Sequence, residues 1–261
     1  MPEPQAEAVV RVERVGHILV MTLARPRARN AVNAAVAAGL EAAVDLLETD
    51  DELWAGVLTG DGPVFCAGAD LKAVAAGGLA DLVTERGGFA GFVRRARTKP
   101  VIAALNGDAL AGGMELAIAC DLVLAAEGVR MGIPEAARSL LAVGGALANL
   151  PKLIGEKAAL ELAMTALPWP AERFVGLGLV SAVVPQADLR AQALRLAESI
   201  CANAPLAVRA SRAVIVDGRE LDQNARWELA ERHLAELVAT ADYREGLESF
   251  VEKRQPRWTG R

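Results

Sequence analysis

The spacing of apolar and polar positions predicts strands mainly in the first half of the chain and helices mainly in the second. Residues 8–14 alternate between apolar and charged side chains and are followed by a Gly-His pair and an apolar run, which predicts a β-hairpin over 8–14 and 17–23. Continuous apolar runs are typical of strands buried on both faces, and they occur at 53–59, 101–105 and 122–125. A further short strand is predicted at 129–132.

Helical patterns begin between these strands and dominate later. An alanine-rich helix is predicted at 33–48 and a short one at 91–98, and the Ala/Gly-rich residues 73–90 predict an irregular, mobile flap. Late helices are predicted at about 186–202, 205–217, 222–238 and 242–253. Strands mixed with helices, followed by helices alone, predict an α/β core with a helical extension. We place the core in residues 1–200 and the extension in residues 201–261.

The composition narrows the class of protein. The 261 residues are 53% hydrophobic and 23% charged, which is typical of a globular protein with a large core. The net charge of −5 favours neither nucleic acid nor an anionic membrane as a partner. The first residues lack the basic and then apolar pattern of a signal peptide, and no apolar run reaches the roughly 18 residues of a membrane span, so we expect a cytoplasmic protein.

The cysteines and histidines argue against several kinds of site. The three cysteines are far apart and form no Cys-x-x-Cys pair, so we expect free thiols in a reducing compartment. The two histidines, His17 and His233, lie at opposite ends of the chain. We therefore expect no Ser-His-Asp triad, no metal site and no redox cofactor.

Glu115 is a charged residue inside an otherwise apolar segment. Gly112-Gly113 follows the strand predicted at 101–105 and opens a segment that is apolar on every face, which predicts a buried helix. No Lys or Arg occurs between Pro100 and Ala126 to neutralise the carboxylate. Glu115 is therefore either a buried group with a shifted pKa or a half-exposed cap of its own helix.

Two glycine-rich corners, Ala67–Asp70 and Ala111–Gly113, each combine a strand end with an oncoming helix. The backbone N–H groups of such corners point outward without partners and can bind a developing oxyanion. Glycines at these positions also fit ordinary tight turns. Because a polarised carbonyl oxygen needs two converging donors, the pair of corners predicts an oxyanion site.

The segment from Asn106 to Asp121 carries a resemblance to a known family. Its pattern Asn-Gly-x-Ala-x-x-Gly-Gly-x-Glu-Leu-Ala, followed by Cys-Asp, resembles the signature of the crotonase superfamily, the enoyl-CoA hydratase/isomerase group. The resemblance continues in the Arg-Pro-x-x-x-Asn-Ala loop that starts at Arg25 and in Glu252-Lys253-Arg254 near the end. Residues 87–91 and 258–261 look most like the carnitinyl-CoA dehydratase branch.

This resemblance implies the fold, the partners and the substrate class. The fold would be a spiral of repeated β-β-α units, with C-terminal helices that join subunits into homotrimers or hexamers. The substrate would be an acyl-CoA thioester, so that CoA is part of the substrate and no separate cofactor is expected. Apolar residues on the late helices would lie between subunits: Leu194, Leu196, Ile200, Val208, Val214, Ile215, Leu229, Leu234 and Leu237.

The resemblance also implies roles for single residues. The amides of Ala69 and Gly112 would hold the thioester oxygen, and the carboxylates of Glu115 and Glu135 would act on one water. Taken alone, Glu135 also fits an ordinary first-turn glutamate after a proline. The residues expected to bind the substrate or its CoA part, with Lys253 acting across a subunit interface, are Arg27, Ala28, Arg29, Ala67, Gly68, Asp70, Leu71, Gly113, Pro134, Phe250 and Lys253.

Some features leave alternatives open. A solvated basic turn fits Arg27 and Arg29 as well as phosphate contacts do, and the CoA role requires a cleft that reaches one of them. The family has glycine, glycine and arginine where this chain has Ser139, Ala146 and Asn149. We predict an enoyl-CoA hydratase that adds water to a 2-enoyl-CoA. Carnitinyl-CoA dehydratase, enoyl-CoA isomerase and a non-catalytic acyl-CoA-binding homologue are the alternatives.

Overall fold

The computed structural model describes residues 8–261, and its main sheet has six strands. The predicted hairpin is confirmed: β1 (Val10–Val15) pairs antiparallel with β2 (Ile18–Leu23). All later neighbours in this sheet are parallel. In spatial order after β2 they are β3 (Ala55–Gly60), β7 (Val101–Leu105), β9 (Leu122–Ala126) and β12 (Ala182–Val184).

A second, smaller sheet continues the strands of the first. Its spatial order is β11 (Trp169–Pro170), β10 (Arg130–Gly132), β8 (Asp108–Leu110) and β4 (Val64–Cys66). The chain passes from the large sheet to the small one three times, as β3 to β4, β7 to β8 and β9 to β10, and a helical element follows each time. These are the repeated β-β-α units that the resemblance implies, so the predicted fold class is confirmed.

Two asparagines hold the bends between the two sheets. Asn30 is fully buried, and its Nδ2 donates to the carbonyls of Asp61 and Val64 at 2.9 and 2.7 Å. Asn106 Oδ1 accepts from the amide of Gly60 at 2.9 Å. Each side chain satisfies backbone groups that leave the sheet ladder at the bend. The bends place the ends of β4 and β8 side by side.

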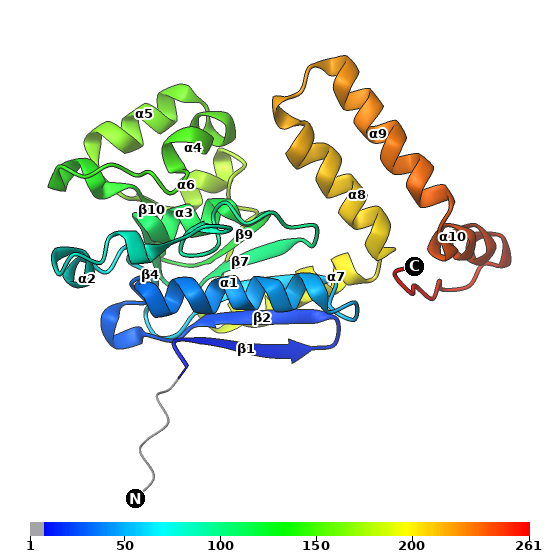
Figure 1. Ribbon diagram of the computed structural model, residues 1–261, viewed down its shortest axis with the longest axis horizontal. Helices are drawn as coiled ribbons and strands as arrows, with labels where there is room; N and C mark the ends of the chain where they lie inside the picture. The colour runs from blue at the N-terminus through cyan, green and yellow to red at the C-terminus, as the bar shows by residue number, and fades with distance from the viewer. Residues whose placement is uncertain (1–7) are drawn as a thin grey trace, which may run out of the picture.

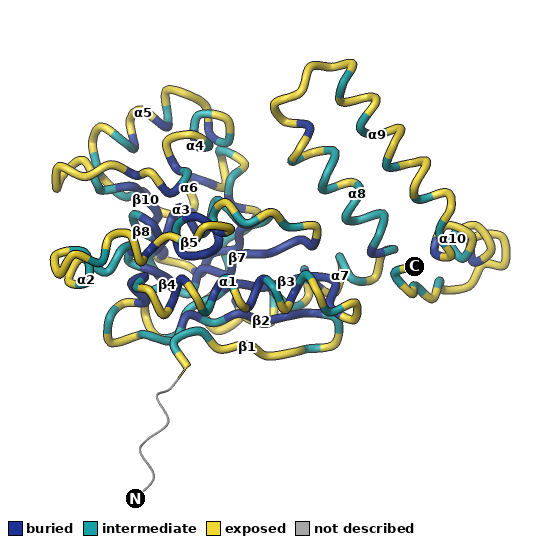
Figure 2. The backbone as a smooth tube through the Cα atoms, viewed as in Figure 1, coloured by how far each residue is buried: buried dark blue, intermediate teal, exposed yellow. Residues whose placement is uncertain are grey.

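Two helices cover the large sheet. The predicted helix α1 (Ala34–Thr49) starts at Asn33, whose side chain caps it, and packs on β1 and β2. Helix α7 (Leu189–Cys201) packs on β2, β3, β7 and β9. Successive strand side chains point to opposite faces, so the two helices enclose the apolar core. Figure 2 shows that the strands between them are mostly buried.

Residues 71–98 differ from the predicted flap and helix. The segment holds α2 (Leu71–Ala75), a short 3-10 turn and a hairpin of β5 (Val83–Thr84) and β6 (Gly88–Phe89). The predicted helix at 91–98 is wrong, since the structure has turns there. Gly88 and Gly91 adopt positive φ, and the amide of Arg94 turns back to the carbonyl of Gly87. Tight turns therefore replace the helical hydrogen bonds.

The remaining helices form two groups, as Figure 1 shows. Beside the small sheet lie α3 (Gly112–Ala119), α4 (Ala146–Ile154), α5 (Glu156–Thr165) and α6 (Ala171–Gly176). Helices α8 (Pro205–Val216), α9 (Gln223–Val238) and α10 (Ala241–Glu252) extend away from the sheets as an arm. Within residues 8–261, none of the helices has the length and apolarity needed to cross a bilayer.

The arm exposes apolar side chains, but α7 does not belong to it. Leu194, Leu196 and Ile200 of α7 pack against the core, so the expectation that they lie between subunits is wrong for a helix that covers the sheet. On the arm, Ile215 is 71% exposed and Phe250 is 84% exposed. Figure 2 shows the exposed colour along most of α9 and α10.

Candidate active site

The two glycine-rich corners predicted from the sequence lie against each other. A methyl group at Gly68, whose φ is 88°, would lie 2.8 Å from the amide nitrogen of Gly112. The first corner is held by Val32, which donates to the carbonyl of Gly68 and accepts from the amide of Asp70, both at 2.8 Å. The second corner is held by the amide of Ala111, which donates to the carbonyl of Gly132 at 2.8 Å. Only glycine fits the contact between the corners.

The amides of Ala69 and Gly112 are the two groups predicted to bind an oxyanion. Gly112 is the first residue of α3, so its N–H has no partner within the helix. Among residues 8–261, no backbone hydrogen bond uses the N–H of Ala69, because the bridge to Val32 is made by its neighbours in the chain. Both residues line one cavity.

Glu115 lies on α3 and is 4% exposed. Its Oε1 accepts a hydrogen bond from the amide of Ala146 at 3.1 Å, at the start of α4. Burial raises the pKa of the Glu115 carboxyl, and the amides of Ala146 and Gly144 partly offset that rise because they favour the ionised form. The sequence left a buried and a half-exposed carboxylate open, and the structure shows the buried one.

Glu135 follows Pro134 in the first turn of a 3-10 helix, η3 (Pro134–Arg138). Its Oε2 is buried and has no hydrogen-bond partner within residues 8–261. Burial raises the pKa of Glu135 to about 7, its own amide acts in the opposite direction, and the charge of Glu115 adds to the rise. The charge state of Glu115 therefore influences how readily Glu135 ionises.

The cavity that contains these groups has a volume of about 430 Å³ and is mostly apolar. Both glutamates and both corners line it, with Leu71 and Pro134 from the expected substrate-binding set. Phe89, which the sequence analysis missed, lies directly on Gly112: a methyl group there would approach its ring to 2.4 Å. No hydrophobic pattern in the sequence indicates this contact, because Phe89 lies in a strand of only two residues. The pocket can polarise a carbonyl and move protons beside it.

Other expected binding residues lie outside the cavity. Within the described chain, the lining contains no residue of 25–31, so this cavity does not reach Arg27 or Arg29. Asp70 caps α2 and pairs with Arg25 at 3.0 Å. Phe250 and Lys253 lie in the arm and its end, which Figure 1 shows on the far side of the molecule. Within the described chain, none of Asp70, Phe250 and Lys253 belongs to the lining of this cavity, although Asp70 lies between two residues that do.

The three departures from the family pattern have separate structural consequences. Ser139 ends η3 with a φ of 56°, in the left-handed region that favours glycine. Ala146 keeps the contact to Glu115 because only its backbone amide is used. Asn149 donates to the carbonyl of Gly145 at 2.9 Å and stabilises the corner before α4.

Two other potentially reactive groups, Cys66 and His17, are not part of the cavity lining. Cys66 ends β4 beside the first corner, and burial raises its pKa to about 12, so the nucleophilic thiolate does not form at neutral pH. His17 stacks on Trp54 with ring centroids 3.8 Å apart, far along the chain from both corners.

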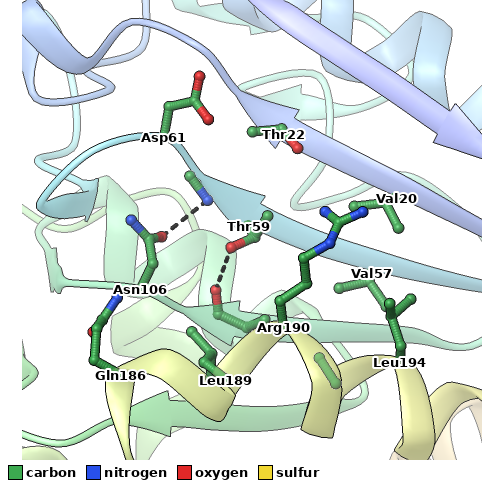
Figure 3. A pocket seen from close by; sticks show the side chains of 13 residues that line it. Val20, Thr22, Val57, Thr59, Asp61, Asn106, Gln186, Leu189, Arg190 and Leu194 are labelled. Carbon is green, nitrogen blue, oxygen red and sulfur yellow. Dashed lines mark hydrogen bonds between the residues drawn. The ribbon is translucent and has the colours of Figure 1, made fainter.

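A second cavity of about 230 Å³ lies under the start of α7, beside the ends of β2, β3 and β7 (Figure 3). Several of its polar side chains already have partners: Thr59 donates to the carbonyl of Ala104 at 2.8 Å, and Asn106 Oδ1 accepts from the amide of Gly60 at 2.9 Å. Arg190 pairs with Glu13, and Asp61 pairs with Arg11. The cavity contains no glutamate and no free pair of amides, so the candidate active site is the larger one.

Known proteins resemble the chain over nearly its whole length. The family model described as enoyl-CoA hydratase/isomerase matches residues 13–261. Mevalonyl-coenzyme A hydratase of Aspergillus fumigatus is 38% identical over 247 residues, 93% of this chain and 91% of the relative. Carnitinyl-CoA dehydratase of Salmonella heidelberg is 36% identical over 254 residues, 95% of this chain and 97% of the relative.

Solved structures agree with the same family. Enoyl-CoA hydratase EchA1 from Mycobacterium marinum is 45% identical and superposes with a TM-score of 0.94, covering 98% of this chain and 100% of that one. Its fold therefore matches the spiral of β-β-α units described above. The chain belongs to the enoyl-CoA hydratase/isomerase family of the crotonase superfamily.

Proposed function

We propose that the protein is an enoyl-CoA hydratase, which adds water to a 2-enoyl-CoA and forms a 3-hydroxyacyl-CoA. The observation that carries this proposal is the placement of Glu115 and Glu135 in one cavity with the free amides of Ala69 and Gly112. Hydration of a conjugated double bond needs a base for the water, an acid for the α-carbon and donors for the carbonyl oxygen. The cavity holds groups suited to all three.

The hydrogen bonds suggest which carboxylate takes which role. Backbone amides donate to Glu115, which favours its ionised form, so Glu115 acts as the base that removes a proton from water. The oxygen of that water bonds to the β-carbon, and the double-bond electrons move to the α-carbon. Glu135, with a pKa of about 7, then supplies the proton to the α-carbon.

The amides of Ala69 and Gly112 stabilise the charge that develops on the thioester oxygen. One such donor is worth roughly 3–4 kcal/mol in other enzymes. Phe89 covers Gly112 and keeps water from this oxygen, so the donors act in a medium of low polarity.

The proposal includes an assembly of subunits. A homotrimer or hexamer in the cytoplasm would cover the apolar arm and bring Lys253 of one copy toward the CoA of another, with Arg27 and Arg29 on the CoA phosphates. Sedimentation at micromolar concentration tests the assembly. A stable monomer would contradict it, together with the role of Lys253.

Two related activities compete with hydration. A dehydratase such as the carnitinyl-CoA relative uses the same two carboxylates in the reverse direction. An isomerase needs only one base, and the inward placement of Glu115 beside Glu135 argues against it.

The decisive experiment assays a panel of enoyl-CoA, 3-hydroxyacyl-CoA and 3-enoyl-CoA thioesters for hydration, dehydration and isomerisation together. The proposal is supported if the wild-type protein hydrates a 2-enoyl-CoA and if both Glu115→Gln and Glu135→Gln lose this activity. Isomerisation without hydration would replace it with the isomerase. Binding of every thioester without turnover of any would identify a binding protein.

A further inference from the structure

The cavity has an inner end and an outer end. The inner end consists of the two corners with Glu115 and Glu135. We use the term outer end for the rest of the cavity, between a wall of residues 71–94 and a wall of residues 138–143. The outer end is lined by apolar side chains and by only two charged residues, Arg94 and Arg138.

Arg94 belongs to the first wall. The carbons of its stem lie against Gly88 of β6, because a methyl group at Gly88 would meet its Cγ, Cβ and Cδ at 2.9, 3.0 and 3.1 Å. The stem is therefore packed on the hairpin, while the residue as a whole is exposed and lines the cavity. A packed stem limits where the guanidinium can go.

Arg138 belongs to the opposite wall and lies three residues after Glu135 in η3. Residues at this spacing in a 3-10 helix stand above one another on the same side. The two nevertheless form no ion pair, and Arg138 is not among the groups that shift the pKa of Glu135. The guanidinium is therefore not held by this carboxylate, and Arg138 is an exposed residue of the cavity lining.

Both arginines lack an anionic partner where their neighbours have one. Arg86, within the first wall, and Arg95, just after it, pair with Asp45 at 2.7 and 2.5 Å. Within residues 8–261, no carboxylate and no other acceptor bonds to the guanidinium of Arg94 or Arg138. Two cations that face a mostly apolar space without partners favour an anionic ligand group between them.

We infer that the acyl chain of the natural substrate ends in a carboxylate, which Arg94 and Arg138 bind from opposite walls. This inference rests on the proposed function, because that function places the thioester at the inner end. The cavity lining includes none of residues 25–31, which that function assigns to the CoA phosphates, so the arginine pair lies along the acyl chain. An acyl chain that ends in a trimethylammonium group would be repelled.

The test compares 2-enoyl-CoA substrates of matched length that end in a methyl, a carboxylate or a trimethylammonium group. We expect the highest kcat/KM for the carboxylate. The variant Arg94→Gln/Arg138→Gln should lose about tenfold to hundredfold on that substrate and less than about threefold on the methyl one. Arg195→Gln, on the exposed side of α7, is the matched control and should change neither.

Two results would overturn the inference. The first is that the wild-type protein shows no preference for the substrate that ends in a carboxylate. The second is that the double arginine variant loses activity equally on all three substrates, which would assign the arginines to the CoA phosphates. Calorimetry with the corresponding saturated acyl-CoAs measures the same preference in Kd without turnover. If the protein hydrates nothing but still binds the carboxylate form more tightly through both arginines, the proposed function fails and the inference stands.

Discussion

The inner and outer ends of the cavity hold their polar groups in different ways. At the inner end, Glu115 accepts from the amide of Ala146, and the oxyanion donors are backbone groups of two touching corners. At the outer end, Arg94 and Arg138 reach the cavity on long side chains, and Leu141 is 67% exposed. Backbone groups cannot be replaced by mutation, whereas exposed side chains can change freely.

This difference separates the reaction from the choice of substrate. In the proposed function, the inner end contacts the thioester and the double bond, which every 2-enoyl-CoA shares. The outer end contacts the part of the acyl chain that differs between substrates. Changes at the inner end should therefore reduce all activities alike, and changes at the outer end should alter their ratios.

The largest effect is expected from the two carboxylates. Glu115→Gln and Glu135→Gln should each lower kcat for every substrate by about 10²- to 10⁴-fold, because each removes a proton-transfer group. The double variant should be far less damaged than the product of the two losses, since both groups act in the same hydration step. Steady-state kinetics measures this, with Glu127→Gln in an exposed turn as the control. Normal hydration by Glu115→Gln alone would show that a single base suffices.

The dependence on pH should also arise at the inner end. Glu135 must carry a proton to donate it, and burial raises its pKa to about 7. Above that pH the protonated fraction of Glu135 falls tenfold for each pH unit. At a pH two units above this pKa, kcat/KM should therefore be about 100-fold below its value at low pH. The outer end should not affect this profile, and Arg94→Gln should retain it. A flat profile up to alkaline pH would rule out Glu135 as the acid.

A smaller loss is expected when Glu115 is displaced rather than removed. A methyl group at Gly144 would lie 2.4 Å from Oε2 of Glu115, so Gly144→Ala should push the carboxylate aside. The clash is with the end of a flexible side chain, so the melting temperature should stay unchanged while kcat falls about tenfold to hundredfold. Gly176→Ala, which meets nothing within 4 Å, is the control. An active Gly144→Ala enzyme would show that the position of Glu115 is not critical.

The smallest effect is expected at the outer apolar wall. Leu141 is mostly exposed, so Leu141→Ala removes little buried surface. Turnover of crotonyl-CoA should change by less than about threefold, and KM should rise only for acyl chains long enough to reach this wall. KM measured across a series of chain lengths tests the prediction. A large loss on crotonyl-CoA would mean that the two ends are coupled.

The inner end could be predicted from the sequence because its signals are local. Glycine pairs after apolar runs marked both corners, and a glutamate in an uncharged segment marked a buried carboxylate. The late helices followed from their spacing in the same way, and three of them form the arm. The predicted helix at 91–98 was wrong because its apolar pattern was weaker than the turns that Gly88 and Gly91 impose.

By itself the sequence predicted the hairpin, the three buried strands of the large sheet, the glycine corners and the family, since each depends on residues that are neighbours in the chain. It did not predict β4, β8, β11 or β12, which are only two or three residues long. The tertiary structure alone decided that Phe89 covers Gly112, that Ala146 holds Glu115, and that Arg94 and Arg138 face one cavity. These contacts join segments that are distant in sequence. An exposed arginine has no local pattern that indicates what it faces, and only the packing of the two walls brings these cations together without a partner.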